Sequence, residues 1–365
     1  MKPQGFDTKH VDQFTDTNEA HHASRRRLRT FKASPSLAYT FDVLGELFFG
    51  GAFGFLESRS DHGRWIESLD TLMPIIVVLA LLPKLYRPVF LIFSILSSPT
   101  RGALSILNGI AETAKHIVSE KQQKLQGNSS QQQRRDILSK LFDLKSRRGE
   151  AEDYTIADIQ YESHVSLFAG SDTTAIAMRA IVYQLMTHPN VEEKLLEELH
   201  DALKAGRLTV PARYADASRL PYFSSCVKEA MRLHPSVGLP MPRHAPTQGC
   251  EIAGHYFPGS KSVSIGINPA VIHYNEAIFG VDADLFKPER WLQDNAAQME
   301  RHLISFGAGT RTCIGKNISL SEIYKMLPQL LLKFKLELAY PGRPLVTKDH
   351  WFHKQEGLDV KVSIR

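Results

Sequence analysis

Phe306-Gly-Ala-Gly309-Thr-Arg311-Thr-Cys313-Ile-Gly315 is the stretch on which the interpretation of the whole chain depends. It matches the pattern F-x-x-G-x-R-x-C-x-G at all five fixed positions. A chance match in a chain of this composition is on the order of one in ten thousand or less. The glycines at 307, 309 and 315 permit tight turns and close approach of the backbone to a flat ring. The stretch therefore predicts a cysteine held in a tight loop against a planar group.

Cys313 is expected just before a helix, where backbone amides directed at its sulfur favour the thiolate. Burial alone would raise the pKa of this thiol, so the amides and a bound metal must outweigh burial. Arg311 is placed to meet an anionic group. A lone cysteine is more often a small buried hydrophobe, but the surrounding motif favours a metal ligand here.

Three further motifs precede this stretch in the sequence. Glu229-Ala-Met-Arg232 places a carboxylate and a guanidinium one helical turn apart, although about one such match is expected by chance. Lys287-Pro-Glu-Arg290-Trp291 follows it. Ala169-Gly-Ser-Asp172-Thr173-Thr174 lies within a long helical stretch, where a central glycine costs roughly 1 kcal/mol relative to alanine and needs an offsetting role.

In their order along the chain, these motifs resemble those of the cytochrome P-450 superfamily of haem-thiolate monooxygenases. The segment Phe41-Asp-Val-Leu-Gly-Glu-Leu-Phe-Phe-Gly50 is similar to the fungal pisatin demethylase-like branch. The resemblance runs from about His21 to the C-terminus and implies one haem-binding domain over residues 1–365. It implies a mainly α fold with small β-sheets, without the family's N-terminal helices and first sheet strands.

The resemblance implies haem b as the cofactor, with Cys313 as the axial ligand of its iron. Residues Phe306, Gly307 and Gly315 would lie against the ring, and Arg311 and Arg243 would contact its propionates. His22 and Arg26, an i, i+4 pair in a basic run, resemble the helix that contacts a propionate from the other side. A basic solvated helix face is the competing interpretation of that run.

The resemblance also implies roles for the remaining motifs. Asp172 and Thr173 would deliver protons at the oxygen-binding face of the haem, with Thr173 near the oxygen and Asp172 as the relay to water. Small residues of this segment would leave room there. The alternative is a solvated Asp and an ordinary helical Thr. Glu229, Arg232 and Arg290 would form a buried structural network, because a buried charge must be paired to be tolerated.

Composition narrows the class of protein. The 365 residues are 43% hydrophobic and 23% charged, with a net charge of +5, which fits a globular enzyme with an acidic partner or an anionic membrane surface rather than nucleic acid. Three widely spaced cysteines indicate a reducing compartment without a disulfide framework. Residues 1–11 are polar, so no signal peptide or leading membrane anchor is expected in this chain.

The spacing of apolar residues, together with the positions of capping residues and prolines, predicts the main helices and strands. A capping box at Thr155–Asp158 opens a helix that ends near Thr187. Further helices are expected over 191–203, 223–233 and from just after Cys313 toward Phe334, with a kink at Pro328, and short strands over 251–267. Residues 127–135 are expected to form an exposed loop. The Pro-broken apolar tract Leu72–Leu96 is either buried core or an interfacial membrane segment.

We expect a monooxygenase that inserts one atom of dioxygen into a hydrophobic small molecule of secondary metabolism. Its electrons would come from an NADPH-dependent cytochrome P-450 reductase, and the full-length protein would lie on the cytosolic face of the endoplasmic reticulum membrane. One alternative is a truncated, catalytically silent fragment or pseudoenzyme. Another is an oxygen-independent haem-thiolate isomerase or dehydratase, against which Asp172 and Thr173 argue.

Overall fold

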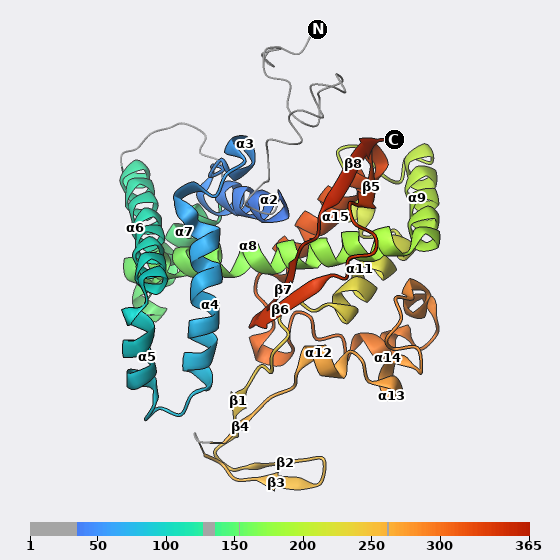
Figure 1. Cartoon of the computed structure of the whole chain (residues 1–365). Coiled ribbons are helices and arrows are strands. Elements are labelled where there is room, and N and C mark those ends of the chain that lie inside the picture. The colour runs from blue at the N-terminus through green and yellow to red at the C-terminus, as the bar shows by residue number, and fades with distance from the viewer. Residues whose placement is uncertain (1–34, 127–135, 153, 261–262) are drawn as a thin grey trace.

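The computed structural model describes residues 35–126, 136–152, 154–260 and 263–365 (Figure 1). The predicted basic helix with His22 and Arg26, and the predicted loop over 127–135, lie outside the described residues. Within them the chain is mainly helical with small two-stranded antiparallel sheets, which confirms the predicted fold class.

The helices are α2 (Pro35–Leu44), the π-helix η1 (Gly45–Phe49), α3 (Phe55–Ser58), η2 (His62–Arg64), α4 (Trp65–Leu81), α5 (Arg87–Leu96), α6 (Ser98–Gln126), α7 (Ile137–Glu152), α8 (Ile156–Thr187), α9 (Pro189–Lys204), α10 (Tyr214–Ala217), α11 (Pro221–Leu233), α12 (Pro269–Ile272), α13 (Glu276–Phe279), η3 (Pro288–Leu292), α14 (Ala296–Glu300), η4 (Gly309–Arg311) and α15 (Lys316–Lys333). The strands are β1 (Arg243–His244), β2 (Cys250–Ile252), β3 (His255–Phe257), β4 (Ser264–Ile265), β5 (Phe334–Leu338), β6 (Val346–His350), β7 (Phe352–Glu356) and β8 (Val360–Ile364).

Helix α8 crosses the molecule and joins its two halves (Figure 1). It begins at the predicted capping box: the Thr155 hydroxyl accepts a hydrogen bond from the Asp158 amide at 3.3 Å, and the Thr155 amide donates to Asp158 Oδ2 at 2.7 Å. It ends at Thr187, before His188-Pro189, because the residue before a proline is disfavoured in helical conformation. Both predicted ends of this helix are confirmed.

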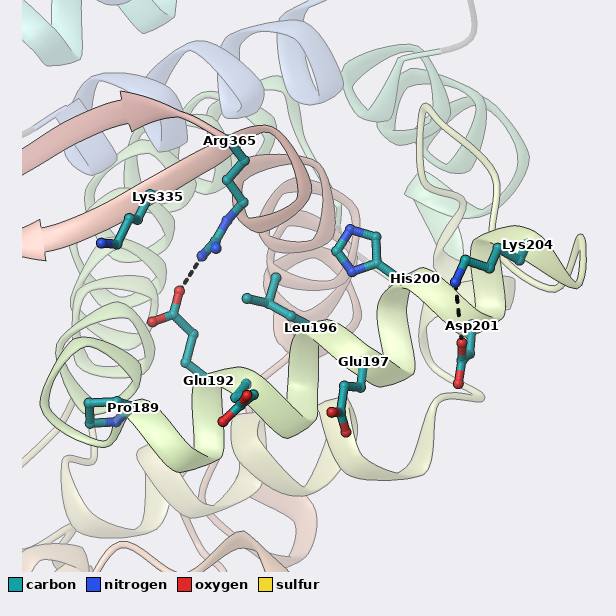
Figure 2. Close-up of a pocket in the computed structure, with 10 residues that line it drawn as sticks. Pro189, Glu192, Leu196, Glu197, His200, Asp201, Lys204, Lys335 and Arg365 are labelled. Carbon is teal, nitrogen blue, oxygen red and sulfur yellow. Dashed lines mark hydrogen bonds and ion pairs between the residues drawn. The ribbon is translucent and has the colours of Figure 1, made fainter.

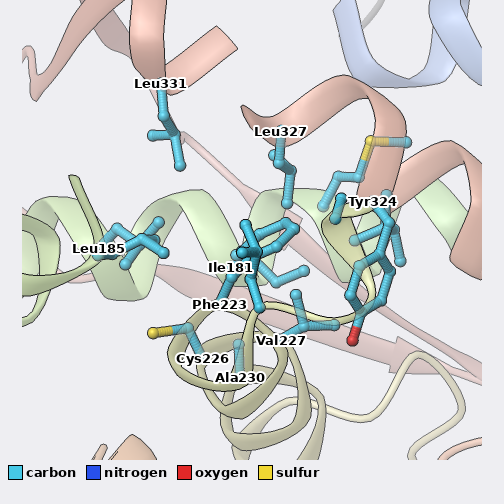
Figure 3. Close-up of a cluster of buried hydrophobic side chains, with 14 of the residues drawn as sticks. Ile181, Leu185, Phe223, Cys226, Val227, Ala230, Tyr324, Leu327 and Leu331 are labelled. Atoms are coloured by element: carbon cyan, nitrogen blue, oxygen red, sulfur yellow. The ribbon is translucent and has the colours of Figure 1, made fainter. Parts of the chain in front are cut away.

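The largest hydrophobic core lies around the C-terminal half of α8 (Figure 3). Ile181 and Leu185 of α8 pack there against α11 and α15, represented by Phe223, Leu327 and other fully buried side chains. Pro328 lies within α15 and does not interrupt the helix, which runs from Lys316 to Lys333. This core fixes the start of α15, the point at which the Cys313 loop joins it.

The N-terminal half of α8 packs against α2, α6 and α7, and apolar side chains of α4 share a cluster with it (Figure 1). The contact with α2 is close: a Cβ on Gly170 would lie 2.9 Å from Leu44 Cδ1, and the Thr40 hydroxyl donates to the Ser171 carbonyl at 2.9 Å. The glycine expected to leave room at a haem face therefore makes room for Leu44. Close helix packing offsets the cost of a glycine in mid-helix.

The apolar tract Leu72–Leu96 divides into a buried and an exposed part. Leu72 and Met73 of α4 are 2% and 6% exposed and belong to the core. The end of α4, the connecting turn and α5 turn apolar side chains outward, and α5 buries none of its residues. The exposed side chains are Leu81, Leu85, Tyr86, Val89, Ile92, Phe93 and Leu96. The interpretation as buried core thus holds for the start of the tract, and for the exposed part the interfacial membrane segment stays a prediction.

The strands form local hairpins and pairs. The β6–β7 hairpin lies near the centre of the molecule, and an isolated bridge joins Val237 to Phe352 (Figure 1). The strand expected to extend to 267 is reduced to Ser264–Ile265. Beyond this strand, the Met241 amide still donates to the Ile267 carbonyl at 3.4 Å in the same register, so the pairing continues past Pro242 by one long hydrogen bond.

Candidate functional site

The 306–315 stretch forms a tight loop that ends at a helix. The Cys313 amide donates to the Phe306 carbonyl at 2.8 Å and closes the loop. Gly307 and Gly309 have φ of +70° and +69°, the left-handed region that favours glycine. Helix α15 begins at Lys316, three residues after the cysteine, as the sequence predicts. Gly309, a fixed position of the pattern, and Gly307 thus allow the backbone path that presents Cys313.

The donor set presented by this loop fits an iron porphyrin. Cys313 and Arg311 are exposed, and Arg243 on β1 is exposed with its Nη1 donating only to nearby carbonyls, Pro242 at 2.9 Å among them. One cysteine sulfur and two guanidinium groups match an axial ligand and propionate partners. Across the described ranges, no three His, Cys, Asp or Glu residues gather to bind a metal ion by themselves. A porphyrin needs only one axial ligand because it brings its own nitrogens.

The loop is fixed from behind by hydrogen bonds to α11 and its surroundings. The Ser305 hydroxyl donates to the Met231 carbonyl at 3.0 Å. The Ile304 amide donates to Nε2 of the fully buried His273 at 2.9 Å. Burial lowers the pKa of His273 to about 4, so its ring is neutral and able to accept this bond at neutral pH. The position of the cysteine loop therefore depends on an uncharged histidine.

A buried ionic network lies behind the loop. The Glu229 carboxylate accepts hydrogen bonds from Arg232 Nε and Nη2 at 2.9 Å each, Arg290 Nε at 2.8 Å, Trp291 Nε1 at 2.9 Å and the Lys287 amide at 3.0 Å. Glu229 and Arg232 are both 0% exposed. This network joins α11 to η3. Sequence reasoning named the three charged members, and Trp291 adds a fourth side chain that adjoins Arg290 in the chain.

The α8 motif presents two faces. Ser171 and Asp172 are buried, whereas Ala169 is exposed and Thr173 is partly exposed one turn later. The Thr173 hydroxyl donates to the Ala169 carbonyl at 3.0 Å, and the Thr173 carbonyl accepts from the Ser236 hydroxyl at 2.7 Å. The open face of this segment is therefore the one with Ala169 and Thr173.

Asp172 is buried beside a cation and does not lie in solvent. Its side chain is 1% exposed, and Oδ2 lies 3.1 Å from Lys354 Nζ of β7. Neither carboxylate oxygen accepts a well-aligned hydrogen bond from any residue that the structure describes. Burial raises the pKa of Asp172, and the positive charge of Lys354 opposes that rise. Lys354 was missed in the sequence because it lies in no motif and reaches Asp172 only through the placement of the β6–β7 hairpin.

The segment after α11 connects α8 to the cysteine loop. Ser236 hydrogen-bonds to Thr173, and Met241 Sδ would lie 3.8 Å from a Cβ on Gly307. Between these points, Val237 packs in an apolar cluster that also contains Phe168 and Met73. From their apolar character in the sequence, Phe168, the stretch Val237 to Leu239 and the Leu72–Leu96 tract are predicted to line a substrate pocket. The chain thus brings the cysteine loop, the α8 motif and this apolar cluster to one region.

A surface groove of about 870 Å³ lies elsewhere, along α9 and the ends of β5 and β8 (Figure 2). Its wall is polar: Glu192 pairs with Arg365 across it, and Glu197 and His200 line one side. It contains none of the motif residues. We assign it no part in the chemistry of the cysteine loop.

Comparison with known proteins identifies the family. The cytochrome P-450 family model matches residues 8–359. The chain is 40% identical over 330 residues to the cytochrome P-450 monooxygenase gsfF of Penicillium aethiopicum, covering 90% of this chain and 65% of that protein. It is 37% identical over 329 residues to a cytochrome P-450 monooxygenase of Alternaria alternata, covering 90% and 86%. It is 32% identical over 321 residues to pisatin demethylase of Fusarium vanettenii, covering 87% and 59%. The chain therefore spans less than two thirds of two of these relatives, and it belongs to the cytochrome P-450 family.

Proposed function

We propose that this protein is a haem-thiolate monooxygenase that inserts one oxygen atom from dioxygen into a hydrophobic small molecule. The observation that carries this proposal is the loop that presents Cys313 three residues before α15, linked by residues 234–243 to the α8 segment with Thr173. Bound haem b would supply the activation of dioxygen, and a thiolate ligand favours cleavage of the oxygen–oxygen bond. Names of relatives such as cytochrome P-450 monooxygenase agree with this reaction class.

The residues of the chain would act around that group. Cys313 would ligate the iron, and Arg311 and Arg243 would pair with the propionates. Thr173 would hold a proton at its hydroxyl on the open face of α8, and Asp172 would return protons to it from within the protein. The positions of the two side chains suit these roles, since Thr173 is partly exposed and Asp172 is buried next to Lys354.

The substrate class follows from the apolar cluster. Met73, Phe168 and Val237 contribute apolar surface from α4, α8 and the segment after α11, and Phe352 adds an aromatic ring 6.3 Å from that of Phe168. Such a lining favours a hydrophobic molecule. Relatives named as fungal monooxygenases and a pisatin demethylase support a substrate from secondary metabolism.

The experiment is a labelling assay. The chain is coexpressed with an NADPH-dependent cytochrome P-450 reductase, supplied with a panel of methoxylated and prenylated aromatic compounds, and incubated under isotopically labelled dioxygen. We expect one labelled oxygen atom in a hydroxylated product, or consumption of dioxygen with release of an aldehyde where an O-alkyl group is lost, and no product from Cys313→Ala. Product formed without consumption of dioxygen would instead indicate an oxygen-independent reaction.

We further propose that the electron donor docks near the Cys313 loop. Lys316 and Lys325 of α15 are exposed close to this loop, and a positive surface favours an acidic partner. Charge reversal at both lysines is expected to slow reduction by the reductase and to weaken its dependence on salt. Unchanged reduction rates would place the donor elsewhere.

We also propose that the full-length protein lies on the cytosolic face of the endoplasmic reticulum membrane, with the exposed tip of α4 and α5 against the bilayer. The support is the outward apolar surface, on which Leu85 and Phe93 are 80% and 68% exposed. Flotation with anionic phospholipid vesicles tests the contact. Leu85→Asp with Phe93→Asp should reduce binding, whereas Val281→Asp, at a site 89% exposed and distant in sequence, should not.

A further inference from the structure

Lys354 of β7 lies between two carboxylates from different helices. Its Nζ is 3.1 Å from Asp172 Oδ2 on α8, and it forms a second ion pair with Asp70 on α4. The three groups differ in exposure: Asp172 is 1% exposed, Lys354 is 20% exposed and Asp70 is 49% exposed at the side chain. One partly buried ammonium group thus joins a buried acid to a partly solvated one.

The backbone on both sides of Lys354 is held against α8 and the segment that follows α11. The His353 amide donates to the Ser236 carbonyl at 3.0 Å, and the Gln355 side chain donates to the Ile176 carbonyl at 3.0 Å. Lys354 is therefore fixed relative to Asp172. Asp70 instead belongs to α4, which continues into the exposed tip at Leu81 and beyond.

The charges around this group come from several elements. Arg179 lies two turns after Asp172 on α8, Glu356 follows Lys354 on β7, and His234 follows α11. Burial raises the pKa of Asp172, whereas Lys354 lowers it and Asp70 raises it. Without Lys354, Asp172 would share Arg179 with Asp70 and Glu356, and its neutral form would be favoured.

We infer that Lys354 is a positioning residue that holds the Asp172 carboxyl group in place for proton transfer and favours its ionised form, and that Asp70 on α4 competes for the same ammonium group. An apolar ligand that displaces α4, which contributes Met73 to the apolar cluster, would change how strongly Lys354 holds Asp172. The functional part of this inference rests on the proposed monooxygenase activity. The electrostatic part concerns the carboxyl group alone.

The test measures protonation of Asp172 directly. The pH midpoint of the carboxylic acid stretching band is recorded by infrared difference spectroscopy on the purified chain, with the band assigned by its loss in Asp172→Asn. Lys354→Met should raise the midpoint by about one pH unit or more, because the opposing positive charge is gone. Asp70→Asn should lower the midpoint, because Lys354 then serves Asp172 alone. Lys354→Arg should restore a midpoint near that of the wild type.

The two single substitutions act in opposite directions, so loss of folding in one leaves the other decisive. An unchanged midpoint in the folded variants, or equal shifts in both, would overturn the inference. Coupling of oxygen consumption to product is measured on the same variants. Shifted midpoints without any product would refute the proposed reaction while leaving the assignment of Lys354 intact.

Discussion

Two buried acidic groups of this protein have opposite surroundings. Glu229 accepts five hydrogen bonds from α11, η3 and the residue before η3, and two guanidinium groups balance its charge. Asp172 is almost as deeply buried and has an ammonium group 3.1 Å away, but neither of its oxygens accepts an aligned hydrogen bond. A fully bonded carboxylate is fixed in charge and position. An incompletely bonded carboxylate retains the capacity to take up and release a proton, and it is the one next to Thr173.

The largest effect is expected from neutralising Glu229. Glu229→Gln leaves Arg232 buried without a counterion and Arg290 with Asp282 alone, and breaking such a buried pair costs about 3–5 kcal/mol. We expect the variant to lose most of its stability in urea unfolding, or to be insoluble. The exposed Glu251→Gln is the matched control and should unfold with the wild type. A Glu229→Gln variant of wild-type stability would contradict the structural role of the network.

Glu322 of α15 provides a third case, a buried acid without a charged partner. Neither of its oxygens has a hydrogen-bond partner within the described part of the chain, and burial raises its pKa to about 8. Because the folded-state pKa lies above the unfolded value near 4.5, stability is full below that value and falls as the pH rises from 4.5 through 8. Glu322→Gln should remove this fall and be more stable than wild type at alkaline pH, on the order of 3 kcal/mol. If the wild type and Glu322→Gln showed the same slope of stability against pH, Glu322 would be paired in solution.

His273 connects the Glu229 network to the Cys313 loop. Its folded-state pKa is lowered to about 4, so the unfolded chain binds its proton first as the pH falls below 6.5. Stability should therefore decline from pH 6.5 toward 4, by on the order of 2 kcal/mol for this group. Once protonated, the His273 ring can no longer accept the hydrogen bond from the Ile304 amide. Thermal unfolding as a function of pH should show a shallower acid slope in His273→Gln than in wild type.

The smallest effect on stability is expected at Asp172. Asp172→Asn keeps the shape of the side chain, and Lys354 retains Asp70 as a counterion, so we expect a change within about 1 kcal/mol. Its effect should appear instead in the fraction of consumed oxygen that reaches product. Thr173→Ala should likewise uncouple oxygen consumption. A large loss of stability in Asp172→Asn would show that Asp172, like Glu229, is held by interactions that stabilise the fold. It would contradict the difference between the two acids.

The features predicted from the sequence are those set by local chemistry. The cap at Thr155, the end of α8 before His188-Pro189 and the start of α15 after Cys313 each depend on a few adjacent residues. Glu229 and Arg232 are one turn apart, so the pattern alone places them together.

The features that the sequence did not predict depend on long-range packing. Lys354 meets Asp172 and Asp70 only because the β6–β7 hairpin lies against α8 and α4, and no periodicity encodes that contact. Gly170 faces Leu44 of α2 for the same kind of reason. Glu322 carries no motif signal, since its burial becomes apparent only once α15 has packed.

The absorption spectrum of the reduced, carbon-monoxide-bound protein tests the central claim that Cys313 is the axial thiolate of a bound haem. We predict a Soret band at the long-wavelength position characteristic of thiolate ligation in the wild type, lost in Cys313→Ala and retained in Cys226→Ala, whose thiol is buried in the core. A band at the shorter-wavelength position in the wild type, or a chain that folds without binding haem, would contradict the assignment and favour a silent fragment.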